Sequence, residues 1–277
     1  MSGSSGFAAL VWQGRPVQIE YEWIAPERGT APLVVFLHEG LGSVAMWKDF
    51  PHRLCDAGNL RGLVLSRPGY GRSTPRAPGE TWGVDFMHRQ AGEVLPAFFD
   101  ALGIAEPPWL FGHSDGASIA LLHASMFPHR VGGLIVLAPH IFVEDVTIRN
   151  IVLARDAYQH ADLRHRLARY HDDPDSAFGG WSGIWLDPAF RTWNISAEIA
   201  HVRAPVLAVQ GLDDEYGTLA QVHGIAAVVP GTRVLELPRC GHSPHRDCAD
   251  VVIAQSVAFM RQHAHPWRDG RDGRGGR

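Results

Sequence analysis

The sequence "FGHSDGASIALLHASMF", residues 111–127, has the pattern of a strand, a sharp turn and a helix. An apolar run ends here, Gly112-x-Ser114-x-Gly116 follows, and apolar residues then recur at helical spacing. Glycines on either side of Ser114 allow the close backbone approach that a tight bend between strand and helix requires. The pattern predicts that the Ser114 hydroxyl projects beyond the carboxyl end of a strand.

Short apolar runs bounded by Gly or Pro recur along the chain and are typical of strands buried on both faces of a parallel sheet. The runs are 32–38, 62–67, 109–113, 133–139, 205–211 and 232–238. Between them lie amphipathic stretches at 81–102, 117–127 and 249–263. This alternation predicts the α/β class, with a mostly parallel, doubly wound sheet.

Residues 141–202 interrupt the alternation. They contain no strand-like run; a charged, helical stretch is followed by Trp181, Trp185 and Trp193 among Gly, Asp and Pro. Because the segment is too long for an ordinary loop, we predict a helical lid inserted into a core of residues 7–140 and 203–265. The ends, 1–6 and 268–277, are expected to be disordered.

Composition excludes several classes of protein. The 277 residues are 45% apolar, enough for one large core, and the net charge of −4 gives no basic surface for nucleic acid. Apolar runs are too short to span a bilayer. Three cysteines without metal-type spacing favour a reducing, cytoplasmic setting. We expect a small-molecule partner, no nucleic acid and no membrane; a homo-oligomer stays open.

A serine nucleophile needs a base, and the base needs an orienting acid. The sequence "QGLDD" places Asp213 and Asp214 just past one predicted strand, and "CGHS" places His242 just past the next. Carboxyl ends of parallel strands share one edge of a sheet, so these side chains are expected to meet Ser114. Asp213 is an alternative to Asp214 as the acid, and His245 an alternative to His242 as the base.

With "FLHEGLGS", "SRPGYGRS" and "GHSDG", these motifs resemble the α/β-hydrolase fold family over residues 7–263. The resemblance implies that Ser114 is the nucleophile and His242 its general base. It assigns the orienting acid to Asp214 through the family's G-x-x-D pattern. No metal and no organic cofactor is implied.

The resemblance also implies an oxyanion hole made by the backbone amides of Asp115 and Gly40, with Leu41 as the alternative to Gly40. Glu39 departs from the glycine usual in this motif. Its carboxylate would lie close to the developing charge, so we expect it to turn aside into a salt bridge. Glu39 and the three tryptophans of the predicted lid are the candidate substrate-pocket residues, although packing within the lid and against the core is the simpler interpretation of the tryptophans.

The reaction implied by the resemblance is hydrolysis of a small carboxylic ester. A serine nucleophile disfavours dehalogenases and epoxide hydrolases, and leaves C–C bond hydrolysis of ring-cleavage products, thioesterase or lactonase activity as alternatives. The G-x-S-D-G elbow is also similar to that of the valacyclovir hydrolase group. That similarity implies a cationic substrate group paired with Asp115, whereas a helix-start carboxylate is the simpler interpretation.

Two functions of other classes compete with hydrolysis. Gly40-x-Gly42-x-x-Ala45 follows a predicted strand and imitates a dinucleotide-binding fingerprint, with Arg67 at the end of the next strand as an NADP site would have. That oxidoreductase hypothesis leaves Ser114 unexplained. A ligand sensor on a hydrolase scaffold is disfavoured because every residue needed for catalysis is present.

Overall fold

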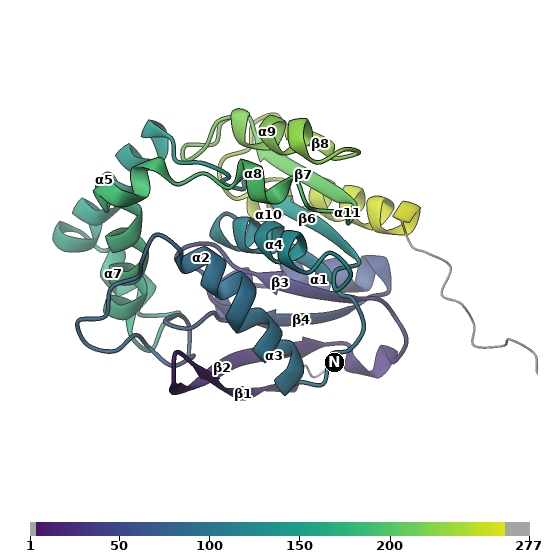
Figure 1. Cartoon of the computed structure of the whole chain (residues 1–277), viewed down its shortest axis with the longest axis horizontal. Coiled ribbons are helices and arrows are strands. Elements are labelled where there is room, and N and C mark those ends of the chain that lie inside the picture. The colour runs from purple at the N-terminus through teal and green to yellow at the C-terminus, as the bar shows by residue number, and fades with distance from the viewer. Residues whose placement is uncertain (1–3, 264–277) are drawn as a thin grey trace, which may run out of the picture.

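The computed structural model of the protein describes residues 4–263 and shows one sheet with helices on both faces (Figure 1). The strands are β1 (Ser4–Trp12), β2 (Arg15–Ile24), β3 (Leu33–Leu37), β4 (Arg61–Leu65), β5 (Trp109–His113), β6 (Gly133–Leu137), β7 (Val206–Gly211) and β8 (Arg233–Leu237). Their order in the sheet is β1-β2-β4-β3-β5-β6-β7-β8. The strands from β4 to β8 pair in parallel, whereas β2 is antiparallel to both β1 and β4. The predicted doubly wound, mostly parallel fold is confirmed.

Helices connect the parallel strands. The α-helices are α1 (Phe50–Gly58), α2 (Phe86–Arg89), α3 (Leu95–Ala101), α4 (Asp115–Met126), α5 (Asp145–His160), α6 (Leu163–Leu167), α7 (Pro174–Trp185), α8 (Ser196–Ile199), α9 (Ala220–Val228), α10 (Pro244–Asp247) and α11 (Ala249–His263). Short 3-10 turns occupy η1 (Pro26–Arg28), η2 (Val44–Trp47) and η4 (Pro188–Thr192), and a π-helical stretch, η3 (Gln90–Val94), joins α2 to α3.

Each central strand contributes alternate side chains to two hydrophobic cores. In β3, Val35 and Leu37 pack in the core beneath α3, α4 and α9, whereas Val34 and Phe36 pack in the core beneath α1 and α11. All five residues of β3 are buried. Burial on both faces explains why the parallel strands are continuous apolar runs rather than alternating ones.

The amino-terminal hairpin was not predicted. Strand β1 begins at Ser4, and residues 4–6 pair with residues 23–21 of β2, so the prediction that residues 1–6 are disordered is wrong for these three. Backbone pairing in an antiparallel ladder orders this Ser- and Gly-rich stretch, which carries no hydrophobic signal. The predicted disorder of 268–277 lies outside the described residues.

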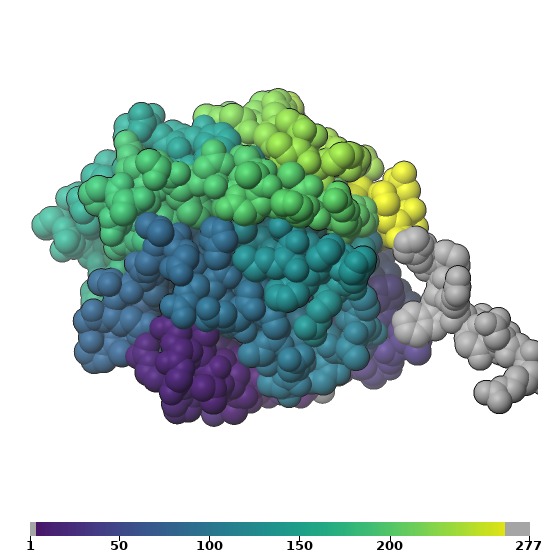
Figure 2. Space-filling model, viewed as in Figure 1, coloured from purple at the N-terminus to yellow at the C-terminus, as the bar shows by residue number. Residues whose placement is uncertain are grey.

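Residues 141–202 contain helices α5 to α8 and no strand of the sheet. Figure 1 shows α5 and α7 gathered at one end of the sheet, and Figure 2 shows the green atoms of the later part of the segment along the face in view. A single antiparallel bridge between Phe142 and Asn194 brings the two ends of the segment together. Its function as a lid stays a prediction.

Within residues 4–263, no helix combines the length and apolar character needed to cross a membrane. The three cysteines are free thiols; Cys55 and Cys240 are buried and Cys248 is partly buried. None of them lines the cavity described below.

Candidate active site

Ser114 lies on the tight bend between β5 and α4. Its backbone has φ 51° and ψ −119°, in the left-handed half of the map that non-glycine residues rarely enter. A Cβ atom on Gly116 would lie 2.1 Å from the carbonyl oxygen of Leu37, and one on Gly112 would lie 2.5 Å from the backbone of Ala117. Only glycine fits at these two positions, which explains the G-x-S-x-G spacing.

A chain of hydrogen bonds links Ser114, His242 and Asp214. The Nε2 atom of His242 lies 2.9 Å from the Ser114 Oγ atom, and its Nδ1 atom lies 2.9 and 3.0 Å from the two carboxylate oxygens of Asp214. Since a carboxylate can only accept, Nδ1 carries the proton and Nε2 accepts from the serine hydroxyl. These three residues therefore have the relative placement that the sequence predicted.

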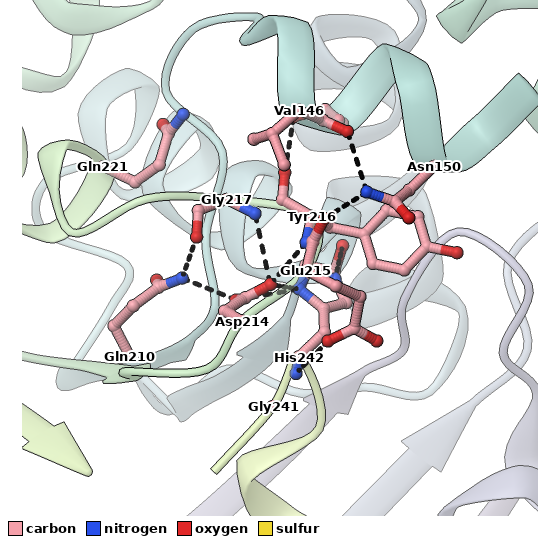
Figure 3. A network of polar contacts seen from close by, with 12 residues as sticks. Val146, Asn150, Gln210, Asp214, Glu215, Tyr216, Gly217, Gln221, Gly241 and His242 are labelled. Atoms are coloured by element: carbon pink, nitrogen blue, oxygen red, sulfur yellow. Dashed lines mark hydrogen bonds and ion pairs between the residues drawn. The ribbon is translucent and has the colours of Figure 1, made fainter. Parts of the chain in front are cut away.

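Asp214 is held by three further hydrogen bonds (Figure 3). Its carboxylate accepts from the amides of Tyr216 and Gly217, at 2.8 and 3.1 Å, and from the Gln210 side chain at 2.5 Å. Burial opposes ionisation, but the His242 hydrogen bond and charge and the Tyr216 amide outweigh it, so the Asp214 pKa lies below its ordinary value. Asp213 is exposed, so Asp214 rather than Asp213 faces His242.

Two further histidines, His113 and His245, lie close to the loop that carries His242. His245 is buried, with its ring 4.9 Å from Trp47 and 4.8 Å from His113, and does not line the cavity at Ser114. His113 donates from Nε2 to the carbonyl oxygen of His242 at 2.6 Å. The geometry therefore favours His242 over His245 as the base, and His113 braces the loop that carries His242.

Glu39 is turned aside, as expected. Its Oε2 atom lies 3.5 Å from His113 Nδ1, and its Oε1 atom lies 3.8 Å from the Arg246 guanidinium. Burial raises the Glu39 pKa, but the hydrogen bond and charge of His113 outweigh it and hold the pKa well below its ordinary value. The side chain still lines the cavity at Ser114, where it adds a negative charge.

The backbone amides of Gly40, Leu41 and Asp115 are available to a ligand. In the part of the chain that the structure describes, none of the three donates a hydrogen bond to a protein acceptor, and all three residues line the same cavity as Ser114. A Cβ atom on Gly40 would lie 2.1 Å from the Trp181 indole, so this position also requires glycine. The choice between Gly40 and Leu41 stays open.

A cavity of about 130 Å³ lies over the serine, and we call it the serine cavity. Its lining residues are Glu39, Gly40, Leu41, His113, Ser114, Asp115, His140, Thr147, Ile151, Trp181, Trp185, Tyr216, His242 and Ser243. Of the predicted aromatic wall, Trp181 and Trp185 line this cavity. Trp193 does not; its ring stacks on Phe190 at 5.1 Å, behind Trp185.

Asp115 points into the protein and links the elbow to residues 141–202. Its Oδ1 atom accepts a hydrogen bond from Trp185 Nε1 at 3.1 Å, and its Oδ2 atom lies 3.8 Å from the Arg67 guanidinium. Burial raises the Asp115 pKa above its ordinary value, against the charge of Arg67 and the Trp185 hydrogen bond. Arg67 is itself buried beneath the site, so it offers no phosphate site of the kind that the NADP hypothesis requires.

His140 and Tyr216 were missed by sequence reasoning. The rings of His140 and Tyr216 lie 5.6 and 4.8 Å from that of His242. Burial lowers the pKa of His140 to about 3, so this side chain is neutral. A signal was available, because both residues closely follow the carboxyl end of a strand, where open α/β sheets place their sites.

Residues 34–255 match the alpha/beta hydrolase family. A 2-hydroxy-6-oxo-6-phenylhexa-2,4-dienoate hydrolase of Comamonas testosteroni is 25% identical over 85% of this chain and 90% of its own length. A 2-succinyl-6-hydroxy-2,4-cyclohexadiene-1-carboxylate synthase of Yersinia enterocolitica is 34% identical over 84% of this chain and 88% of its own length.

Solved structures with the same fold include a thermophilic esterase from Thermogutta terrifontis, with a TM-score of 0.71 and 17% identity over 96% of this chain and 100% of the esterase. An enol-lactonase from Burkholderia xenovorans LB400 gives a TM-score of 0.71 and 22% identity over 91% and 99% of the two chains. The motifs, the sheet order and the match over residues 34–255 agree: the chain belongs to the alpha/beta hydrolase family.

Proposed function

We propose that the protein is a serine hydrolase that cleaves a small-molecule carboxylic ester through an acyl-enzyme. The observation that carries the proposal is the continuous chain from Ser114 Oγ through His242 to the Asp214 carboxylate, with contacts of 2.9 to 3.0 Å, on a strained turn beside unused amides. A nucleophile, a base in the right tautomer and preorganised donors are the parts that acyl transfer requires.

In the proposed mechanism, Ser114 Oγ attacks the ester carbonyl carbon while its proton passes to His242 Nε2. The carbonyl oxygen becomes an oxyanion, which the Asp115 amide and the amide of Gly40 or Leu41 stabilise. His242 then gives its proton to the departing alcohol, and the carbonyl of the acyl-enzyme re-forms. Water, deprotonated by His242, attacks this carbonyl; the acid leaves, and the proton returns to Ser114. Asp214 stabilises the imidazolium in both halves.

The segment 141–202 is proposed to act as the lid of this site. Thr147 and Ile151 of α5 line the serine cavity opposite the elbow, as do Trp181 and Trp185 of α7. Helix α5 is also tied to the loop that carries Asp214, because Thr147 Oγ1 donates to the Tyr216 carbonyl at 2.5 Å. Such walls exclude water from the acyl-enzyme and bind the apolar part of a substrate.

Hydrolysis of a C–C bond is the second candidate, and it is favoured by the names of two relatives. Besides the dienoate hydrolase described above, a second protein of Comamonas testosteroni, a 2-hydroxy-6-oxononadienedioate/2-hydroxy-6-oxononatrienedioate hydrolase, is 24% identical over 84% of this chain. Ser114 would attack a ketone in place of an ester; the carbon that departs with the electron pair of the broken bond would take the proton that His242 accepted from the serine. Thioester and lactone hydrolysis need no additional residue either.

A comparison of substrates tests the proposal. The purified protein is assayed with p-nitrophenyl esters of graded acyl length and with 2-hydroxy-6-oxo-6-phenylhexa-2,4-dienoate, and the Ser114→Ala variant serves as the blank. We expect ester turnover that falls by at least about a thousandfold in Ser114→Ala, whose fold is retained. Faster turnover of the dienoate than of any ester would move the assignment to C–C bond hydrolysis.

Active-site titration separates an enzyme from a ligand sensor. A serine-directed phosphonate should label one serine per chain, and peptide mapping should find the label on Ser114. Labelling without turnover of any substrate in the panel would favour the sensor. Ester turnover that persists at more than about a tenth in Ser114→Ala would remove Ser114 as the nucleophile.

A further inference from the structure

A second cavity, of about 590 Å³, adjoins the serine cavity. Leu41 and Tyr216 line both cavities and form the boundary between them. The larger cavity has four cationic side chains in its wall, Lys48, Arg166, Arg169 and Arg246. We call it the basic vestibule.

The charge of the basic vestibule is opposite to that of the whole protein. The four cationic side chains of its wall are accompanied by one carboxylate, Glu215, whereas the chain has a net charge of −4. Glu215 is engaged with the active-site loop, because its Oε2 atom accepts from the His242 amide at 3.1 Å. Cationic side chains gathered around one hollow attract anions more strongly than the same charges spread over a surface.

Two of the four cations are not neutralised by the protein. Arg246 lies 3.8 Å from Glu39, and Arg166 lies 3.7 Å from Asp162. Lys48 and Arg169 have no carboxylate within 4.0 Å among residues 4–263.

Lys48 is an exposed side chain that contacts Tyr170 in the wall of the vestibule. Its ammonium donates to the Tyr170 hydroxyl at 2.6 Å and lies 4.2 Å from the centre of that ring. The hydroxyl and the ring hold the ammonium in place without cancelling its charge, because neither is an anion.

The serine cavity differs from the basic vestibule in two ways: it is small, and the charged side chains that line it include carboxylates. Its volume of about 130 Å³ is well below the 300 to 1,000 Å³ usual for small-molecule sites, so all but the smallest substrates must extend beyond it. Glu39 lines it, and its carboxylate would repel an anionic group placed next to Ser114. The basic vestibule adjoins the serine cavity across Leu41 and Tyr216 and offers the additional space.

We propose that the substrate carries a carboxylate remote from the scissile carbonyl, and that this carboxylate binds in the basic vestibule against Lys48 and Arg169. This inference rests on the proposed function, because it takes the carbonyl to lie at Ser114. Leu163 and Leu167 supply an apolar wall for the carbon chain between the two groups. The arrangement selects a substrate with a neutral reacting end and an anionic far end.

Matched substrate pairs test the inference on either side of the ester. On the acyl side, mono-p-nitrophenyl glutarate is compared with p-nitrophenyl 5-oxohexanoate, in which a methyl ketone replaces the carboxylate. On the alcohol side, 4-acetoxybenzoate is compared with 4-acetylphenyl acetate. We expect the anionic member of at least one pair to have the higher kcat/KM, by roughly tenfold, and the preference to shrink as ionic strength rises.

The variant Lys48→Gln/Arg169→Gln removes the two unpaired charges. It should lower the anionic-to-neutral ratio of kcat/KM by roughly five- to tenfold, through KM of the anionic ester rather than kcat. The matched control is Arg203→Gln/Arg233→Gln. These residues lie next to the amino ends of β7 and β8, at the opposite edge of the sheet, and the control removes the same charge without changing the ratio.

The outcomes distinguish the two proposals. Equal kcat/KM within both pairs, or a ratio that Lys48→Gln/Arg169→Gln leaves unchanged, would overturn the vestibule inference while ester hydrolysis stands. Failure to turn over any ester, neutral or anionic, would overturn the proposed function instead. In that case glutarate binding to the Ser114→Ala protein is measured by calorimetry; binding unaffected by Lys48→Gln/Arg169→Gln, or no binding, would overturn the inference as well.

Discussion

His113 Nε2 donates a hydrogen bond of 2.6 Å to the backbone carbonyl of His242. The residue next to the nucleophile in the sequence thus fixes the loop of the proposed base, which lies 129 residues further along the chain. On the other side of the same ring, Nδ1 faces the Glu39 carboxylate at 3.5 Å. The serine and the histidine are therefore positioned relative to each other through one side chain as well as through the sheet.

Replacement of His113 should reduce catalysis by displacing His242. We expect His113→Leu, which lacks the donor, to lower kcat by about ten- to a hundredfold with little change in KM, because misplacement of a reacting group by about 1 Å costs rates of this order. His113→Gln keeps a donor and should recover part of the loss. Rates are normalised to phosphonate-titrated sites, so a loss that is only misfolding would vanish on normalisation.

Asp115→Asn should destabilise the protein without changing its preference for charged esters. The amide can still accept from Trp185, but Arg67 loses its nearby carboxylate, which we expect to cost about 1 to 3 kcal/mol in urea unfolding. Because Arg67 lies so close to this carboxylate, an amino-acid ester and its uncharged analogue should lose activity equally. A loss confined to the cationic ester would instead establish Asp115 as a recognition residue.

Substitutions of Trp185 and Trp193 should have different effects, the first on substrate selection and the second on stability. Trp185 lines the serine cavity, so Trp185→Phe should change the relative KM of small and bulky esters by several-fold. Trp193→Phe serves as the comparison, since Trp193 packs against Phe190 outside the cavity and should change the melting temperature more than the KM ratio. The interpretation fails if the two variants shift the KM ratio alike.

Buried histidines should make the protein sensitive to mild acid. Burial lowers the pKa of His123 to about 4 and of His140 to about 3, and lowers those of His38 and His245 as well. Below about pH 6.5 these histidines are protonated in the unfolded chain but stay neutral in the folded chain. The free energy of unfolding therefore decreases as the pH falls from 6.5 towards 4. For His123 alone the loss at pH 5 is about 2 kcal/mol.

Urea unfolding at pH 7.5 and pH 5 measures this loss. His123→Gln should reduce the difference between the two pH values by about 2 kcal/mol, whereas His160→Gln, at an exposed position, should leave the difference as in the wild type. An undiminished pH difference in His123→Gln would show that this histidine is not kept neutral by burial.

The parallel strands could be predicted because strands buried on both faces are apolar along most of their length, and such runs are visible in the sequence. Strands β3 to β8 were predicted to within two residues at either end. Of these, β3 to β7 are largely buried apolar runs, whereas β8 is partly exposed and includes Arg233 and Glu236. Strand β2 was missed because one face is exposed and only a period-two pattern marks it, with Val17 and Ile19 buried between polar residues. Ser4 joins the sheet through its backbone, which no side-chain pattern records.

The site likewise contains residues that a sequence motif reveals and contacts that no sequence pattern records. Ser114, His242 and Asp214 each stand in a turn whose backbone geometry demands particular neighbours, so motifs reveal them. The contact of Arg67 with Asp115 depends on a side chain of the loop after β4 meeting one at the start of α4, and no spacing along the chain encodes it. Which of the tryptophans reaches the cavity is likewise set by how α7 packs.

The bridge between Phe142 and Asn194 has a consequence for how such a protein diversifies. The residues proposed for the chemistry follow β3, β5, β7 and β8, whereas Thr147, Ile151, Trp181 and Trp185 all belong to one stretch whose ends meet at this bridge. A single recombination event could therefore exchange a large part of the substrate-facing wall as a cassette. Such an exchange would alter this wall and leave the residues proposed for the chemistry in place.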